Sequence, residues 1–136
     1  EARLLGASAV LLICAILDTK TLERYLQIAD SLGLSAIVEA HDEDEVASAA
    51  AAGARIIGVN NRNLKDFTVD IRNSIRLRSF APAGTIFVAE SGIRTPEDVE
   101  TLRQNGVNAV LVGEQLMRAE SPKAELNRLR GMERRF

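Results

Sequence analysis

The chain alternates short apolar runs with longer segments of mixed polarity, and a glycine precedes each apolar run. The five pairs are Gly6 with residues 10–13, Gly33 with 36–38, Gly53 with 56–59, Gly84 with 86–88 and Gly106 with 109–112. Glycine readily takes the left-handed conformation that ends a helix, and a short continuous apolar run suits a strand buried on both faces of a sheet. The pattern predicts five repeats of helix, glycine and buried parallel strand.

The segments between the apolar runs carry helix signals. Residues 19–32 and 70–80 repeat apolar side chains at helical spacing, and residues 42–52 begin with acidic residues and end in an alanine run. Thr95-Pro96 and Ser121-Pro122 each join a capping hydroxyl to a proline at the first helical position. No linker or composition shift divides the chain. We therefore predict one domain over residues 1–136, an α/β fold of five parallel strands alternating with helices.

Composition narrows the function classes. The 136 residues are 46% hydrophobic and 26% charged with a net charge of -2, which is ordinary for a soluble globular protein and lacks the basic excess of a nucleic-acid binder. No apolar run has the length of a membrane span. The lone Cys14 excludes an intrachain disulfide and fits a reducing compartment, so we expect a cytoplasmic protein. His and Cys each occur once, so no metal site is expected.

The first residues of the chain suggest a longer parent. Residues 1–6 resemble the last turn of a helix, and no initiator methionine precedes them. We therefore expect a piece of a longer protein, with an ordinary processed terminus as the alternative.

Polar side chains follow the predicted strands. Glu39, Asn60 and Glu90 each come directly after aliphatic residues, at the carboxyl ends where parallel α/β folds collect functional groups. A carboxylate placed there is partly buried and needs a partner. Each glutamate alone could instead cap the next helix or pair with a lysine, and Asn60 could instead belong to an asparagine-rich turn.

Two further strand ends predict an anion site. Ser91-Gly92 forms a tight polar loop, and Gly113-Glu114 opens a short helix, where glycine lets an anion approach free backbone amides. Glu114 is an unexpected neighbour for a phosphate, so we expect its carboxylate to point away and its amide to bind. We interpret His41 as a capping or surface residue, with no obvious partner in sequence, and Cys14 as a small buried thiol.

Five segments resemble indole-3-glycerol phosphate synthase of tryptophan biosynthesis, in family order along essentially the whole chain. They are residues 11–17, 37–41, 57–64, 89–93 and 111–118. The resemblance implies a (βα)8 barrel, or TIM barrel. Its implied reaction is ring closure, decarboxylation and dehydration of 1-(2-carboxyphenylamino)-1-deoxyribulose 5-phosphate, a sugar-phosphate substrate, by a lyase without metal or organic cofactor.

The resemblance also implies roles for individual residues. Glu39 would support the general acid electrostatically, Glu90 would bind the substrate or help remove its hydroxyl, and Asn60 would position the substrate. Arg62 would support the loop after Asn60, and Leu11 would line the anthranilate pocket. The implied phosphate-binding residues are Ser91, Gly92, Gly113 and the amide of Glu114.

The chain departs from the family in what it lacks. Its five strands resemble strands four to eight, so the first three βα units and their catalytic lysines are absent, and we expect no turnover by this chain alone. A partial barrel leaves two open sheet edges. We expect self-association through them, with a covering parent segment or an open flavodoxin-like sheet as alternatives. Two other functions stay open: a non-catalytic folding or assembly module, and another phosphate-binding barrel such as phosphoribosylanthranilate isomerase.

Overall fold

The computed structural model describes residues 1–63 and 65–131; Leu64, the last residue of the segment 57–64, lies outside the described residues. The strands are β1 (Ala9–Ile13), β2 (Ser35–Ala40), β3 (Ile56–Asn60), β4 (Ile86–Glu90) and β5 (Ala109–Leu111). The helices are η1 (Cys14–Ile16), α1 (Thr19–Ser31), α2 (Glu43–Ala51), α3 (Arg72–Arg78), α4 (Pro96–Gln104), α5 (Glu114–Arg118) and α6 (Pro122–Leu129). The predicted alternation of strands and helices is confirmed.

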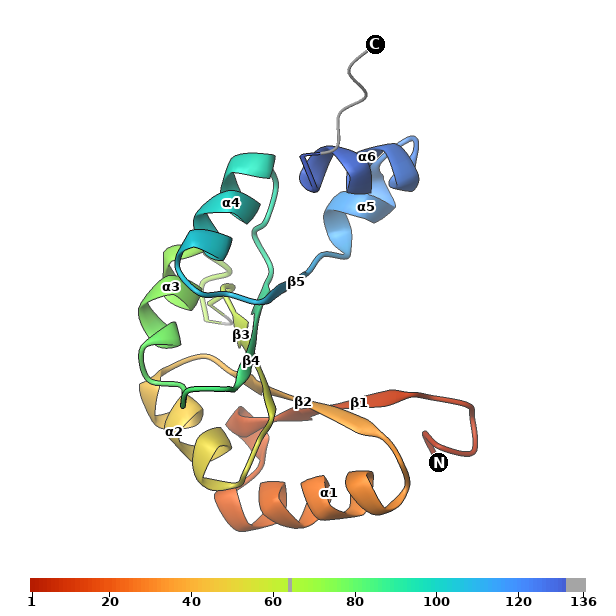
Figure 1. The fold of residues 1–136 in the computed structure, drawn as a ribbon, viewed down its shortest axis with the longest axis vertical. Coiled ribbons are helices and arrows are strands. Elements are labelled where there is room, and N and C mark those ends of the chain that lie inside the picture. Colours follow the sequence, from red (N-terminus) through yellow and green to blue (C-terminus); the bar gives the residue numbers. More distant parts are fainter. Residues whose placement is uncertain (64, 132–136) are drawn as a thin grey trace.

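The five strands form one parallel sheet in the order β1-β2-β3-β4-β5. Each strand therefore pairs with the next in sequence, which is the strand order of a TIM barrel and differs from the 2-1-3-4-5 order of a flavodoxin-like sheet. Helices α1 to α4 lie along one side of the curved sheet, and its other side is uncovered (Figure 1). The structure is a partial barrel, and the flavodoxin-like alternative is wrong.

Local signals in the sequence set the ends of the helices. Asp18 accepts a hydrogen bond from the Thr21 amide, and Thr95 and Asp98 form a reciprocal capping box at the start of α4. All five glycines that precede the strands take positive φ, between +66° and +87°. The third predicted helix is shorter than expected: residues 70 and 71 form a turn in which Asp70 accepts from the Arg72 amide, so α3 begins at Arg72.

The core lies between the sheet and helices α1 to α4. Val38, Ile57, Val59 and Phe87 are fully buried there, together with helix residues such as Leu22. Because side chains alternate along a strand, the residues between these positions, including Glu39, Gly58 and Glu90, face the uncovered side.

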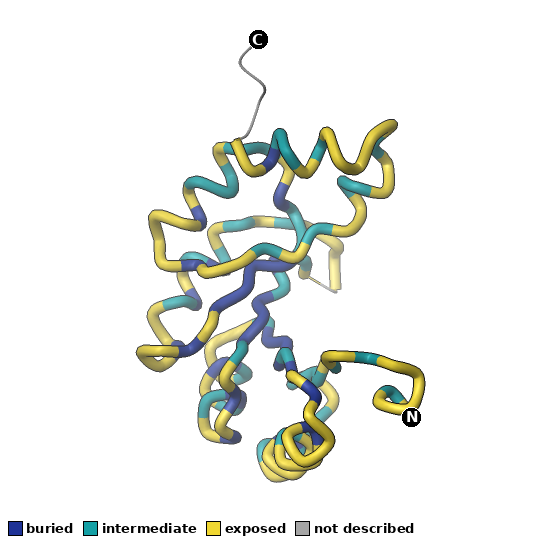
Figure 2. The backbone as a smooth tube through the Cα atoms, turned by 45° about the vertical axis from the view of Figure 1, so that its right-hand side comes forward, coloured by how far each residue is buried: buried dark blue, intermediate teal, exposed yellow. Residues whose placement is uncertain are grey.

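The two outer strands correct one prediction. The apolar runs predicted strands buried on both faces, and β2 to β4 largely satisfy this, but Leu11 of β1 and Leu111 of β5 are 50% and 48% exposed. Figure 2 shows buried residues along the middle of the sheet and exposed ones toward both ends of the chain. Within the described residues, each outer strand pairs with another strand on one side only, and Leu11 and Leu111 are half exposed there.

Candidate active site

Three of the predicted site residues meet at the carboxyl ends of the central strands. Glu39 is the second-last residue of β2, Asn60 is the last residue of β3 and Glu90 is the last residue of β4. Asn60 pairs with Glu90, and Glu39 pairs with Gly58. Both glutamates are buried, with 8% and 5% of their surface exposed. The sheet thus places two carboxylates on one face, separated by a single strand.

Gly58 provides the space between these carboxylates. A Cβ at this position would overlap Oε1 of Glu90 and press on Ile37 of β2. The Glu90 side chain therefore lies across the bare backbone of β3 toward β2. Glycine is required here for close approach, while its backbone angles are ordinary.

Proximity and burial change the acidity of Glu90. Burial is the largest cause, followed by the charge of Glu39 and a hydrogen bond shared with it, and together they raise the pKa of Glu90 to about 7. Oε1 of Glu90 is buried and accepts no hydrogen bond from an N–H group or hydroxyl among the described residues. A carboxyl group of this kind exchanges a proton near neutral pH, which is the property that general acid–base chemistry requires.

The contacts of Asn60 fit both interpretations that the sequence leaves open, a residue of the site and a residue of a turn. Its Nδ2 lies 3.5 Å from Oε2 of Glu39, at the long limit of a hydrogen bond, and its Oδ1 accepts from the Arg62 amide at 3.0 Å. The second contact is the Asx turn expected of an asparagine-rich segment. The same side chain therefore shapes the loop and faces the carboxylate pair.

Asn61 is a residue that the sequence analysis missed. It is 4% exposed, its Oδ1 accepts from the amide and hydroxyl of Ser74, and its Nδ2 donates to the carbonyl of Ser91. These bonds tie the end of β3 to α3 and to the loop after β4. Nothing in the sequence separates this anchoring asparagine from its neighbours, because its partners lie 13 and 30 residues away.

The loop after β4 has a strained backbone. Ser91 takes φ of +66° and Gly92 takes +79°. A Cβ at Gly92 would also overlap the Val69 side chain, so both the backbone and the space demand glycine. Non-glycine residues at positive φ persist where surrounding contacts hold them, and Asn61 supplies such a contact.

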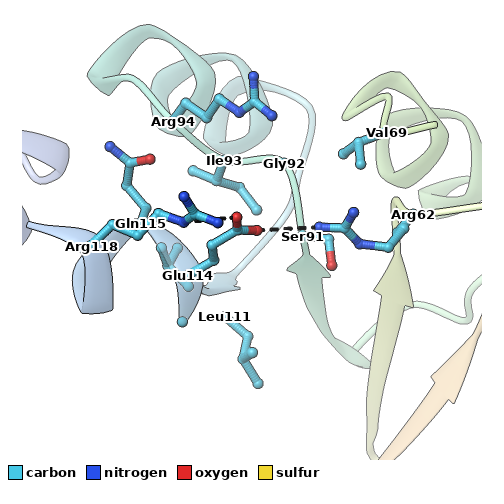
Figure 3. A pocket seen from close by; sticks show the side chains of 12 residues that line it. Arg62, Val69, Ser91, Gly92, Ile93, Arg94, Leu111, Glu114, Gln115 and Arg118 are labelled. Carbon is cyan, nitrogen blue, oxygen red and sulfur yellow. Dashed lines mark hydrogen bonds and ion pairs between the residues drawn. The ribbon is translucent and has the colours of Figure 1, made fainter. Parts of the chain in front are cut away.

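The predicted anion site forms a pocket of about 420 Å³ between the loops after β4 and β5. Ser91, Gly92, Gly113, Glu114 and Arg62 all line it, as Figure 3 shows for most of them. The structure therefore brings together the predicted phosphate-binding residues and Arg62 in one place.

The expected orientation of Glu114 is wrong. Its carboxylate points into the pocket, 3.5 Å from Nη2 of Arg62 and 3.1 Å from Nε of Arg118 (Figure 3). The guanidinium groups of Arg62 and Arg118 attract the carboxylate. Glu114 therefore stands where a bound anion would meet Arg62.

Gly113 and Leu11 lie further from the carboxylate pair. Gly113 precedes α5 with φ of -111°, and a Cβ there would meet nothing within 4 Å. Leu11 faces the uncovered side of the sheet, but it pairs with Ile37, two residues before Glu39, and therefore lies one step below the carboxyl edge. The structure places it beneath the carboxylates and outside the anion pocket.

His41 lies beside the start of α2 and contacts its first turn, as the capping interpretation expected, but it is not a surface residue. Its side chain is 17% exposed, Nδ1 lies 3.1 Å from Oε2 of Glu45, and Nε2 lies 3.6 Å from Oε1 of Glu39. The partner missed in the sequence was Glu45, four residues along.

Cys14 is partly buried. Its burial is the largest cause that raises its pKa to about 11, and the charges of Glu45, Asp42 and Glu39 add to it, which fits an unreactive thiol.

The lysines lie away from the strand ends, as expected. Lys20 is in α1, Lys65 is in the turn after β3 and Lys123 is in α6.

Within residues 1–63 and 65–131, no group of three or more His, Cys, Asp or Glu side chains is arranged to hold a metal. No helix in the same residues is long and apolar enough to cross a membrane.

Sequential parallel strands with polar residues gathered at their carboxyl ends define a TIM-barrel-type protein, of which this chain forms five βα units. Solved structures with this fold include 3-hexulose-6-phosphate synthase, with a TM-score of 0.76 at 16% identity over 95% of this chain and 63% of that one. Thiamine phosphate pyrophosphorylase from Pyrococcus furiosus gives 0.75 at 20% identity over 96% and 61%. At these identities the likeness concerns the fold alone.

The chain belongs to the indole-3-glycerol phosphate synthase family, whose model matches residues 1–129. The synthase of Ruminiclostridium cellulolyticum is 63% identical over 96% of this chain and 50% of its own length. The synthase of Lachnoclostridium phytofermentans is 52% identical over 97% of this chain and 49% of its own. The chain thus spans about half the length of the curated relatives it matches.

Proposed function

We propose that this chain is the carboxyl-terminal half of a lyase that converts 1-(2-carboxyphenylamino)-1-deoxyribulose 5-phosphate to indole-3-glycerol phosphate. The observation that carries the proposal is the buried pair of Glu39 and Glu90 at the carboxyl edge of the sheet. Membership of the synthase family supports the reaction class.

The two carboxylates have different tasks in this proposal. Glu90, with its pKa near 7, can take a proton from the substrate or give one to its departing hydroxyl during dehydration. Glu39 supplies negative charge that stabilises a cationic general acid or a cationic intermediate after ring closure. Asn60, beside Glu39, positions the substrate between them.

We further propose that the pocket lined by Ser91, Gly92 and Gly113 holds the substrate phosphate. Arg62 adds a positive charge to its wall, and the absence of a side chain at Gly113 leaves the adjoining backbone open. A titration with inorganic phosphate, followed by amide NMR, tests this proposal. Shifts confined to the two loops support the site, and Gly113→Asp should abolish them by introducing a like charge. Unchanged shifts in both loops would contradict it.

We propose that the chain alone does not turn over substrate, since none of Lys20, Lys65 and Lys123 reaches the carboxylate pair from a strand end. The test mixes the chain with the first half of the Ruminiclostridium cellulolyticum synthase. Neither half alone should show activity, the mixture should form product, and Glu90→Gln in this chain should remove that activity. Light scattering of the mixture verifies that the halves associate. Turnover by the unmixed chain would contradict this proposal, and an associated but inactive mixture would contradict the synthase assignment.

In the absence of a complementary half, we propose that the chain self-associates through its uncovered sheet face. Leu11, Ile86 and Leu111 on this face are each about half exposed, and in the part of the chain that the structure describes β1 and β5 each pair with a strand on one side only. Light scattering should show dimers or larger species that dissociate on dilution. A monomer at high concentration would contradict this proposal and leave the synthase assignment untouched.

A further inference from the structure

The ring of His41 lies between two carboxylates that come from different elements. Oε2 of Glu45, in the first turn of α2, accepts from the His41 backbone amide at 2.7 Å and lies 3.1 Å from the ring nitrogen Nδ1. Glu39 faces the opposite nitrogen, Nε2, at 3.6 Å. The contact of Nδ1 with Glu45 turns the other ring nitrogen, Nε2, toward Glu39.

Hydrogen-bond chemistry decides where the protons of this cluster lie. An ionised carboxylate only accepts, so Nδ1 must carry a proton toward Glu45. Nε2 is buried and has no hydrogen-bond partner among the described residues. A bare lone pair on Nε2 would repel the lone pairs of Glu39, so the arrangement needs one proton between these two groups, on either of them.

We propose that His41, held by Glu45, is a positioning residue that shares one proton with Glu39 and so controls the charge that Glu39 presents to the site. This inference rests on the proposed function, because it gives His41 a part in the same carboxylate site. A small closure of the 3.6 Å gap is sufficient to form the hydrogen bond. The shared proton extends a line of coupled groups from Glu45 through the ring to Glu39 and Glu90.

Other charged groups surround the His41 ring and contribute to the electrostatic potential at its nitrogens. Asp42 precedes α2, and the Cys14 thiol of η1 donates to the Glu45 carbonyl. The cavity beside the ring, about 740 Å³, is also lined by four cationic side chains and one further acid. These are Arg62, Lys65, Arg72 and Arg76, together with Asp70. Arg72 pairs with Asp70 and Arg76 pairs with Glu43, so Glu39 and Glu45 are the charges in contact with the ring nitrogens.

The test uses the titration of Glu90 as a reporter of the charge on Glu39. In the unmodified chain, the carboxyl ¹³C signal of Glu90 should titrate near pH 7, partly because of the Glu39 charge. Without the proton from His41, the full negative charge of Glu39 acts on Glu90 and raises its titration midpoint. His41→Asn keeps a polar group near Glu45 but leaves the Nε2 position empty, so the Glu90 midpoint should rise by about half a pH unit.

A matched variant separates this role from a purely structural one. His41→Gln places an amide close to the Nε2 position, so it should restore most of the original midpoint. An unchanged Glu90 midpoint in a folded His41→Asn chain would overturn the proposal, and so would equal shifts in both variants. If His41→Asn does not fold, ring ¹⁵N shifts of the unmodified chain decide. An Nε2 without a proton beside an ionised Glu39 would also overturn it. None of these readouts depends on phosphate binding or turnover, so the proposed function can fail separately.

Discussion

The middle and the two edges of the sheet differ in what holds their side chains. In β2 to β4, each strand has a neighbour on both sides, and Glu39, Asn60 and Glu90 are positioned by contacts within the chain. In β1 and β5, strands of similar apolar composition are half exposed, and Leu11 and Leu111 face an uncovered surface. The comparison teaches that a partial barrel can assemble its central carboxylates while its outer strands keep apolar side chains half exposed.

The sharpest test of this difference removes one apolar side chain from each region. Phe87 of β4 is fully buried, and Phe87→Ala should lower the free energy of unfolding by about 3–5 kcal/mol. Leu111→Ala in β5 should cost about 1 kcal/mol or less, because the side chain is already half exposed. Urea denaturation at a concentration where the chain is monomeric measures both. Equal losses would show that the edge strand is as well packed as the centre.

Alanine substitutions of the two loop glycines should also differ in their effect on stability, with the larger loss at Gly92. Gly92→Ala meets both a positive φ and the Val69 side chain, and we expect a loss of about 2–3 kcal/mol. Gly113→Ala meets neither obstacle, so its effect should stay within about 0.5 kcal/mol. Thermal denaturation compares the pair. A harmless Gly92→Ala substitution would mean that the strained loop after β4 can relax.

Burial of Glu90 should make stability depend on pH. Its pKa is raised from 4.5 to about 7, so the protonated form stabilises the folded chain. This contribution is complete below about pH 4.5 and is lost as pH rises through about 7, at a cost of roughly 3 kcal/mol. Glu90→Gln keeps the neutral shape and should remove this decline. The difference in unfolding free energy between variant and parent, measured at pH 5 and pH 8, should therefore grow with pH; a constant difference would contradict the assignment.

The smallest effect on stability is expected at the exposed Glu114. Its pairs with Arg62 and Arg118 are solvent-accessible, so Glu114→Gln should change the free energy of unfolding by less than about 0.5 kcal/mol. The same substitution frees both guanidinium groups, and phosphate affinity should rise several-fold. Glu100→Gln removes the same charge from an exposed pair with Arg103 outside the pocket, so it is the matched control and should leave phosphate affinity unchanged. Weaker phosphate binding by Glu114→Gln would show that the carboxylate helps the site.

Much of the fold was predictable because its signals are local. A glycine with positive φ before each strand and the Thr95-Pro96 helix start depend on a few adjacent residues, and both were confirmed. The meeting of Glu39, Asn60 and Glu90 followed from the rule that parallel strands end at one edge. Their roles in catalysis stay predictions.

The errors concern contacts between distant segments or alternative side-chain orientations. Asn61 is identified as an anchor only by Ser74 and Ser91, which folding brings to it. Glu114 points inward because Arg62, 52 residues earlier, attracts it. The exposure of β1 and β5 likewise follows from absent neighbours and not from their own composition.

The most direct test of the account is the ¹³C titration of the Glu90 carboxyl group in the unmodified 136-residue chain. If the central strands alone assemble the carboxylate pair, the midpoint lies near pH 7, and it falls when Glu39→Gln removes the neighbouring charge. A midpoint near 4.5 that Glu39→Gln does not change would show that the pair is not formed in this chain, and it would contradict the account.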